Sequence, residues 1–247
     1  MAPVSWEGHV VAVTGAASGI GRATAIAFAA SGAEVAAIDA DGAALAGIVD
    51  EQAMAGRAVS PWTVDVGDAE AVDRVVVQLV DRFGQVDSLV HCAAINRGCP
   101  VLDLSVDAWR SILSVNLDGA FFVGRAFGRA MSAQGRGAMV FLTSDLATLG
   151  SPDFAAYSAS KGGVIGLVKS LALALGPQGV TVNALNPGTT DTPMARGGLG
   201  DEGLRGRREA DPLGKISDPS EIAATVMFLC GPARGFMTGQ VVGTRML

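Results

Sequence analysis

Short apolar runs alternate with longer amphipathic segments along most of this chain, and this alternation restricts the possible folds more than any other feature. The runs HVVAVTG at 9–15 and AEVAAID at 33–39 have the length and the nearly continuous apolar character of strands buried on both faces. The segment AEAVDRVVVQLVDRFG at 69–84 has helical periodicity. We therefore expect an α/β fold built from βαβ units, with a doubly wound parallel sheet and helices on both faces.

The later elements continue this rhythm, and no linker or charge run separates two domains. They are a helical stretch from about 106 to 131, a strand at 138–144, a helix across 154–176 and a strand at 180–188. We expect one domain over 1–247. In the segment 189–217, glycines, prolines and charges interrupt the rhythm. This segment is either a disordered insertion or a mobile lid over a substrate.

Composition argues against several classes of function. The chain is 49% hydrophobic and 17% charged, which is typical of an ordered globular protein, and its net charge of −6 disfavours a nucleic-acid partner. Cys92, Cys99 and Cys230 form no CxxC pair and only two histidines accompany them, so we expect no metal site and no disulfide framework. The chain start does not resemble a secretory leader, and no apolar stretch of about eighteen residues runs uninterrupted, so we expect a cytoplasmic protein without a membrane partner.

A glycine-rich loop follows the first predicted strand and opens the first predicted helix. In VAVTGAASGIGRA at 11–23, Gly15, Gly19 and Gly21 have the spacing G-x-x-x-G-x-G. Glycines allow a sharp turn and a close approach of the backbone to a pyrophosphate, which the N-terminal end of a helix attracts. The loop alone is also compatible with a tight turn that binds nothing.

Two aspartates indicate what kind of nucleotide would bind. Asp39 ends the second predicted strand, where its carboxylate can accept hydrogen bonds from ribose hydroxyls and would repel a 2′-phosphate. This favours NAD over NADP, although Asp39 is also compatible with a plain turn at the strand end. Asp65 closes the third predicted strand and either bonds adenine or caps the next helix.

The only tyrosine of the chain, Tyr157, lies four positions before Lys161, one of three lysines. On a helix this spacing places both side chains on one face, where the ammonium can stabilise a phenolate and lower the tyrosine pKa. Ser144 ends the strand at 138–144, where its hydroxyl can polarise a carbonyl. Asn116 interrupts a helical stretch, where its amide can hold a water against the helix backbone and the lysine, or is a kink or solvent-facing residue. Thr189, Thr190 and Thr192 follow NPG at 186–188 and offer donors to a nicotinamide carboxamide.

With these residues in view, the chain resembles the short-chain dehydrogenases/reductases almost from end to end. The resemblance rests on TGAASGIG at 14–21, Asp39, DV at 65–66, VNLDGAF at 115–121, Ser144, YSASK at 157–161 and NPGTTDTPM at 186–194. It implies a Rossmann-type fold and a catalytic set of Asn116, Ser144, Tyr157 and Lys161, with Tyr157 as acid/base, Ser144 polarising, Lys161 lowering the tyrosine pKa and binding ribose, and Asn116 in a proton relay. It implies that NAD contacts Gly15, Ser18, Gly19, Ile20, Gly21, Asp39, Asp65, Val66, Ala93, Asn116, Tyr157, Lys161, Pro187, Gly188, Thr190 and Thr192.

The chain departs from the family pattern at two places. Where the family usually has Asn-Asn-Ala-Gly, the chain has HCAA at 91–94, and His91 is expected to be a buried strand-end residue rather than a catalytic one. The C-terminal TGQVVGTRML lacks the usual Asp-Gly-Gly ending, which commonly supports subunit contacts. We expect a homo-oligomer, either a tetramer or a dimer.

We expect a small-molecule substrate to lie against residues after the strand ends. They are Asn96, Arg97, Asp145, Leu146, Ser151 and Phe154, with the segment 189–217. The arginines at 205, 207 and 208 are expected on a solvated face because acidic residues adjoin them. The function expected is hydride transfer between NAD(H) and a polar, cyclic or carboxylated secondary alcohol or ketone. A 3-oxoacyl thioester reductase and a catalytically silent NAD-binding regulator are the alternatives.

Overall fold

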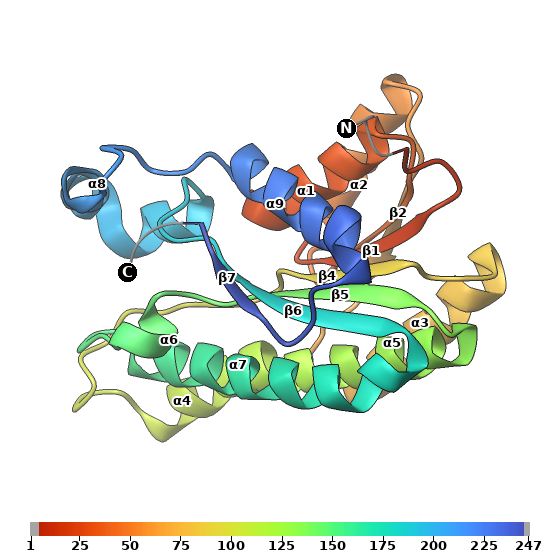
Figure 1. The fold of residues 1–247 in the computed structure, drawn as a ribbon. Coiled ribbons are helices and arrows are strands. Elements are labelled where there is room, and N and C mark those ends of the chain that lie inside the picture. The colour runs from red at the N-terminus through yellow and green to blue at the C-terminus, as the bar shows by residue number, and fades with distance from the viewer. Residues whose placement is uncertain (1–4, 245–247) are drawn as a thin grey trace.

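The computed structural model describes residues 5–244, apart from the side chain of Pro232, and builds them around one parallel sheet (Figure 1). In this range the sheet has seven strands in the order β3-β2-β1-β4-β5-β6-β7. The strands are β1 (Val10–Thr14), β2 (Glu34–Asp39), β3 (Val59–Thr63), β4 (Ser88–His91), β5 (Gly137–Leu142), β6 (Val180–Asn186) and β7 (Val241–Gly243). Every pairing is parallel, which confirms the predicted doubly wound fold.

Helices cover both faces of the sheet (Figure 1). One face carries α1 (Gly19–Ala30), α2 (Gly42–Met54) and α9 (Pro219–Cys230), and the other carries α3 (Ala69–Phe83), α4 (Val106–Leu113), α5 (Gly119–Gln134) and α7 (Ala155–Leu175). Strand β1 shows why both layers form. Val11 and Val13 pack into the core on the α1 and α9 side, whereas Val10 and Ala12 pack into the core on the α3, α5 and α7 side. Alternate residues of a strand point to opposite faces, so an apolar strand needs a cover on each.

The helical stretch that begins at Val106 is continuous through Gln134, but it is not one α-helix. Between α4 and α5 lies a π-helical turn, η1 (Ser114–Asp118), with Asn116 at its centre. The predicted interruption at Asn116 is therefore confirmed. Such turns accommodate one extra residue and change the direction of nearby side chains.

The segment 189–217 is mainly helical, which makes the predicted disordered insertion wrong. Helix α8 (Pro193–Ala210) fills most of it, with a kink at Gly200, whose φ of 63° only glycine adopts easily. A parallel bridge joins Thr190 to Ser217, and the Ser217 N–H donates to Thr189 O at 3.1 Å. The segment is thus an excursion tied at its base. Its motion as a lid stays a prediction.

One short helix and two short 3-10 turns complete the described chain: α6 (Leu146–Leu149), which precedes α7, η2 (Gly176–Gln178), which follows it, and η3 (Pro232–Gly235) before β7. By length and apolar composition alone, Ala155–Gln178 could cross a membrane. This stretch is α7 with its following turn, and in the fold its face with Val164, Val168 and Ala172 packs into the core against the sheet.

Candidate active site

A cavity of about 420 Å³ opens at the carboxyl edge of the sheet, where strand ends and the loops after them meet. Of the sixteen residues predicted to contact NAD, thirteen line this cavity, and the exceptions are Asn116, Gly188 and Thr190. Several residues that sequence reasoning did not single out also line it: Ala40, Val64, Cys92, Ala94, Ile95, Val115, Leu142, Thr143, Pro193 and Met194. Most of these are apolar neighbours of strand ends, and their only sequence signal is that position.

The glycines of the first loop are required by close contacts. A Cβ on Gly21 would lie 2.1 Å from Gly15 O, and a Cβ on Gly15, whose φ is 67°, would lie 2.7 Å from Ala93 N. Helix α1 begins at Gly19, and the side chain of its N-cap residue Ser18 accepts no capping hydrogen bond. The first N–H groups of a helix carry a partial positive charge and bind anions well. A cavity with an uncapped helix start and a glycine cradle fits the pyrophosphate of a dinucleotide.

Asp39 lies at the end of β2 and lines the cavity. Its Oδ2 accepts a hydrogen bond from Ala17 N at 2.9 Å and its Oδ1 accepts one from Asp41 N at 3.1 Å. The carboxylate therefore connects the glycine loop to the turn after β2. These contacts agree with the predicted role as a turn residue, and the ribose contact stays a prediction.

Asp65 also lines the cavity, two residues after β3 ends. Its Oδ1 accepts from Gly67 N at 2.8 Å, whereas helix α3 is capped by Asp68, whose Oδ1 accepts from Glu70 N and Ala71 N. The alternative that Asp65 caps the next helix is therefore wrong. Five residues, 64–68, separate the strand from the helix, so the capping position falls later than the sequence suggested.

Tyr157 and Lys161 lie on one face of α7, as predicted, and both line the cavity. Lys161 is only 2% exposed, its Nζ donates to Leu142 O at 2.8 Å, and burial lowers its pKa to about 8. Its Nζ lies 5.7 Å from the centre of the Tyr157 ring.

The pKa of Tyr157 differs from the sequence expectation. Loss of water around the phenol and the charge of Asp145 raise this pKa to about 12, against a smaller lowering by a hydrogen bond with Ser144. The expected lowering by Lys161 is absent from this arrangement, because the ammonium bonds the backbone of β5 instead of the phenol.

Ser144 follows β5 by two residues, and its side chain is held on both sides. Its Oγ donates to Asp145 Oδ1 at 3.0 Å and accepts from Leu146 N at 3.2 Å. Because Leu146 N also donates to Asp145 Oδ1, the serine and the carboxylate share one helix start.

Asn116 is completely buried in the π-helical turn. Its Oδ1 accepts from Ile95 N at 2.8 Å, and its Nδ2 donates to Ile95 O at 2.9 Å and to Ser160 Oγ at 3.1 Å. The amide thus fixes the loop after β4 and α7 to the turn. Both N–H groups of the amide are therefore used by protein partners, and the predicted contact with a water and the lysine stays a prediction.

His91 lies at the end of β4 and is 1% exposed. Its Nδ1 forms a hydrogen bond with Thr14 Oγ1 at 2.8 Å, and its ring packs against Phe141. Burial lowers its pKa to about 3, and Lys161 adds to this shift. These contacts agree with the expected buried, neutral strand-end histidine.

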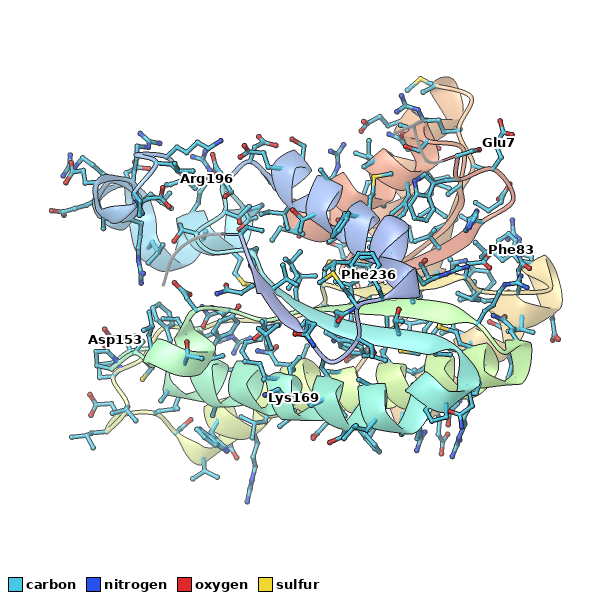
Figure 2. All side chains as sticks on the ribbon, in the orientation of Figure 1. Glu7, Phe83, Asp153, Lys169, Arg196 and Phe236 are labelled. Carbon is cyan, nitrogen blue, oxygen red and sulfur yellow. The ribbon has the colours of Figure 1, made fainter. Side chains whose placement is uncertain are left out.

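A second cavity of about 160 Å³ adjoins the first, and Tyr157 lines both. Its walls include α8 and the segment around α6, and Figure 2 labels one residue from each segment, Arg196 and Asp153, at the same end of the molecule. Of the predicted substrate residues, Asn96, Asp145, Leu146 and Phe154 line this cavity together with Ser144. Arg97 and Ser151 do not line it, and Arg97 is exposed.

Arg207 of α8 lines the second cavity, and its Nη1 lies 3.8 Å from Asp145 Oδ2. The arginines at 205, 207 and 208 are all exposed, as expected, and Arg207, with 42% of its side chain exposed, also reaches this cavity. Pro187 and Thr192 line both cavities, whereas Gly188 and Thr190 line the second. Thr192 also caps α8, because its Oγ1 accepts from Ala195 N. Within residues 5–244, no three His, Cys, Asp or Glu side chains are grouped to hold a metal ion.

Comparison with known proteins extends over nearly the whole chain. A family model described as enoyl-(acyl carrier protein) reductase matches residues 15–244. Galactitol 2-dehydrogenase (L-tagatose-forming) of Cereibacter sphaeroides is 41% identical over 96% of this chain and 93% of its own. The 3-oxoacyl-[acyl-carrier-protein] reductase of Thermotoga maritima is 35% identical over 96% of both chains.

A solved structure shares the fold closely. A Beutenbergia cavernae protein, proposed to be an NAD(P)-dependent gluconate 5-dehydrogenase and solved with NADP at low occupancy, has a TM-score of 0.91. It is 36% identical and the match covers 97% of this chain and 96% of that one. Through its glycine loop, its parallel sheet and these relatives, the chain belongs to the short-chain dehydrogenases/reductases, a family of oxidoreductases that bind a nicotinamide cofactor.

Proposed function

We propose that this protein transfers a hydride between NAD(H) and a polar secondary alcohol or ketone of low molecular weight. The observation that carries the proposal is the position of Tyr157, which lines both cavities, with Lys161 and Asp39 lining the first and Ser144 the second. The first cavity has the glycine cradle and the uncapped helix start that would hold a pyrophosphate. The second is lined by several polar side chains, including Ser144, Asp145 and Thr190, that could bond a small hydroxylated substrate.

The catalytic set proposed is Asn116, Ser144, Tyr157 and Lys161. The Tyr157 hydroxyl exchanges a proton with the substrate oxygen, and Ser144 turns its hydroxyl from Asp145 toward that oxygen. Lys161 supplies the cation that holds ribose and moves the tyrosine pKa down when its Nζ leaves Leu142 O. Asn116 positions the loop after β4 and α7 relative to each other. When bound, the nicotinamide ring supplies the hydride acceptor or donor.

Asp39 supports NAD as the preferred form of the cofactor. Its carboxylate lines the cavity, and Lys161, at the tyrosine, is the only lysine or arginine among the described lining residues. A 2′-phosphate beside Asp39 would meet like charge with no cation among those residues to offset it, a juxtaposition that costs several kcal/mol. We expect kcat/KM with NAD to exceed that with NADP by about a hundredfold or more.

Steady-state kinetics on any accepted alcohol, with NAD and NADP in parallel, test this preference. The Asp39→Ala variant is the matched test, because it removes both the repulsion and the ribose hydrogen bonds. We expect its NAD/NADP ratio to fall toward one. Near-equal kcat/KM values with NAD and NADP in the unmodified protein would show that Asp39 does not face the ribose.

A 3-oxoacyl thioester reductase is the second candidate, and the identity to the Thermotoga maritima relative favours it. Activity assays on one panel of substrates distinguish the two candidates. Oxidation of polyols and cyclic alcohols by NAD supports the first, whereas exclusive reduction of 3-oxoacyl thioesters with NADPH supports the second.

A catalytically silent NAD-binding regulator is the alternative outside catalysis. It would bind NAD and give no reduced nicotinamide with any alcohol of this substrate panel.

We also propose a cytoplasmic homo-oligomer, a tetramer or a dimer. Exposed apolar side chains such as Phe121 on α5 and Leu173 on α7 support association.

A further inference from the structure

The second cavity contains a charge next to the reacting position that hydride transfer itself does not need. Asp145 directly follows Ser144, and its Oδ1 accepts the Ser144 hydroxyl at 3.0 Å and Leu146 N at 2.9 Å. Its side chain is 22% exposed, and its charge contributes to the raised pKa of Tyr157. Asp145 is therefore near both groups that would bind the substrate oxygen.

The second carboxylate oxygen of Asp145 retains hydrogen-bonding capacity. Arg207 Nη1 lies 3.8 Å from Oδ2, which is an ion-pair distance and too long for a hydrogen bond. A carboxylate accepts hydrogen bonds only, so the group that complements Oδ2 is a donor such as a hydroxyl. Ser144 shares a hydrogen bond with Asp145, so a substrate oxygen bound at Ser144 brings the neighbouring carbon beside the carboxylate.

We propose that Asp145 is a specificity-determining residue that accepts a hydrogen bond from a hydroxyl on the carbon next to the reacting one. The substrate class is then neutral vicinal diols, and the α-hydroxyketones that they form. This inference rests on the proposed hydride transfer and narrows its substrate. Oxidation converts the diol to the hydroxyketone: the C–H and O–H bonds of one carbinol break, the hydride goes to NAD and the proton to the phenolate form of Tyr157.

The charges around the second cavity favour a neutral substrate over an acidic one. The charges of Asp145 and Arg207 offset each other, and a substrate carboxylate beside Asp145 would meet like charge at close range. A 3-oxoacyl thioester has a CH₂ next to its reacting carbonyl and offers Asp145 no hydrogen-bond donor. Arg207 belongs to α8, so this pair also connects the 189–217 segment to the start of α6.

Three matched alcohols test the inference: cyclohexane-1,2-diol, cyclohexanol and 2-hydroxycyclohexanecarboxylate. They differ only in the group next to the reacting carbon. With NAD and the unmodified protein, we expect kcat/KM for the diol to exceed that for each of the others by about tenfold or more, the range for a hydrogen bond to a charged group. In Asp145→Ala we expect the ratio of kcat/KM for the diol to that for cyclohexanol to fall to near one. In Asp145→Asn we expect this ratio to recover in part.

Binding is measured alongside turnover, as the shift in Tm of the NAD complex with each alcohol, so the comparison does not depend on catalysis. The Tm and NAD affinity of each variant show that it folds. Equal ratios for diol and cyclohexanol, or a ratio unchanged in Asp145→Ala, would overturn the inference. A preference for the carboxylate that Arg207→Gln abolishes would overturn it too and assign Arg207 instead. Diol-selective Tm shifts without any reduced nicotinamide would support the inference while refuting the proposed hydride transfer.

Discussion

At the scale of single residues, Tyr157 is the group whose charge state decides the chemistry. Its pKa of about 12 means that the phenol is neutral across the physiological range, because loss of water and Asp145 both disfavour the phenolate. A neutral phenol is ready to donate a proton to a ketone oxygen. For alcohol oxidation it must first lose that proton, and Lys161, with a pKa of about 8, is the nearby cation that can assist.

Replacing Tyr157 by Phe removes the transferable proton and leaves the glycine loop and Asp39 untouched. We expect kcat/KM to fall by about a thousandfold, in the range for loss of a general acid or base, with NAD affinity changed by less than about threefold. Steady-state kinetics and an NAD titration measure the two quantities. Turnover comparable to the unmodified protein would refute the role of Tyr157.

Replacing Lys161 by Met tests the two roles assigned to one cation. Methionine matches the length of the buried side chain, so the fold should persist. We expect both kcat and NAD affinity to fall by about tenfold or more, since the same ammonium is assigned to ribose and to the tyrosine pKa. A loss in kcat with unchanged NAD affinity would show that the ribose contact is wrong.

At the scale of elements, the π-helical turn η1 connects three parts of the site. Asn116 uses its whole amide to join the loop after β4, through Ile95, to Ser160 of α7. Removing the side chain in Asn116→Ala leaves the part-buried N–H and C=O of Ile95 without these partners. We expect a loss of about 2–4 kcal/mol in the free energy of unfolding.

Ser160→Ala is the matched control for Asn116, because it removes one of the three hydrogen bonds and leaves the two to Ile95. We expect Ser160→Ala to lose less than half of the free energy of unfolding that Asn116→Ala loses. Urea unfolding measures both variants at one pH. Equal losses would show that the contact with Ile95 is not what stabilises the turn.

Much of the arrangement of elements could be predicted, because apolar periodicity reflects burial directly. The strands β1, β2 and β4 to β6 and the helices α3 and α7 lie where runs and periods placed them. The π-helical turn could not be identified as such, because one extra residue barely alters the pattern. Helix α8 was missed as a helix because its glycines and charges resemble a loop, and it is anchored by Leu204 and by the Thr190–Ser217 bridge.

Site residues on regular elements were easier to predict than those on loops. Tyr157 and Lys161 follow from helix geometry, and Asp145 and Asn96 follow from strand ends. Arg97 and Ser151 also follow strand ends in the sequence, but the loops that carry them do not place them in the lining of the second cavity. Arg207 lies 62 residues after Asp145 in the chain (207 − 145) and belongs to no strand-end motif, and only the path of α8 brings it to Asp145.

At the scale of the whole molecule, His91 couples stability to pH. Its pKa is about 3 in the folded protein and its ordinary value is 6.5, so between these values the unfolded chain binds the proton and the folded one does not. Stability is therefore complete above pH 6.5 and is lost as pH falls toward 3, by an amount on the order of a few kcal/mol. Lys161, whose folded pKa is about 8, is protonated in both states over this window.

The His91→Asn variant tests this coupling, because asparagine stays neutral throughout. We expect the loss in free energy of unfolding between pH 7.5 and pH 5 to be smaller in the variant than in the unmodified protein. Urea unfolding at both values measures it, and the comparison cancels the contribution of the carboxylates. An identical loss in both proteins would show that His91 is not buried as a neutral ring.

Because β1 is hydrogen-bonded to β2 on one side and to β4 on the other, the glycine loop occupies the middle of the sheet and depends on segments distant along the chain. The cavity is lined by residues as far apart as Gly15 and Met194. Parallel pairings of this kind form slowly, since long loops must close before any contact is gained. During refolding from urea, far-UV circular dichroism should therefore recover before the ability to bind NAD, and cofactor binding should serve as the reporter of the last kinetic phase.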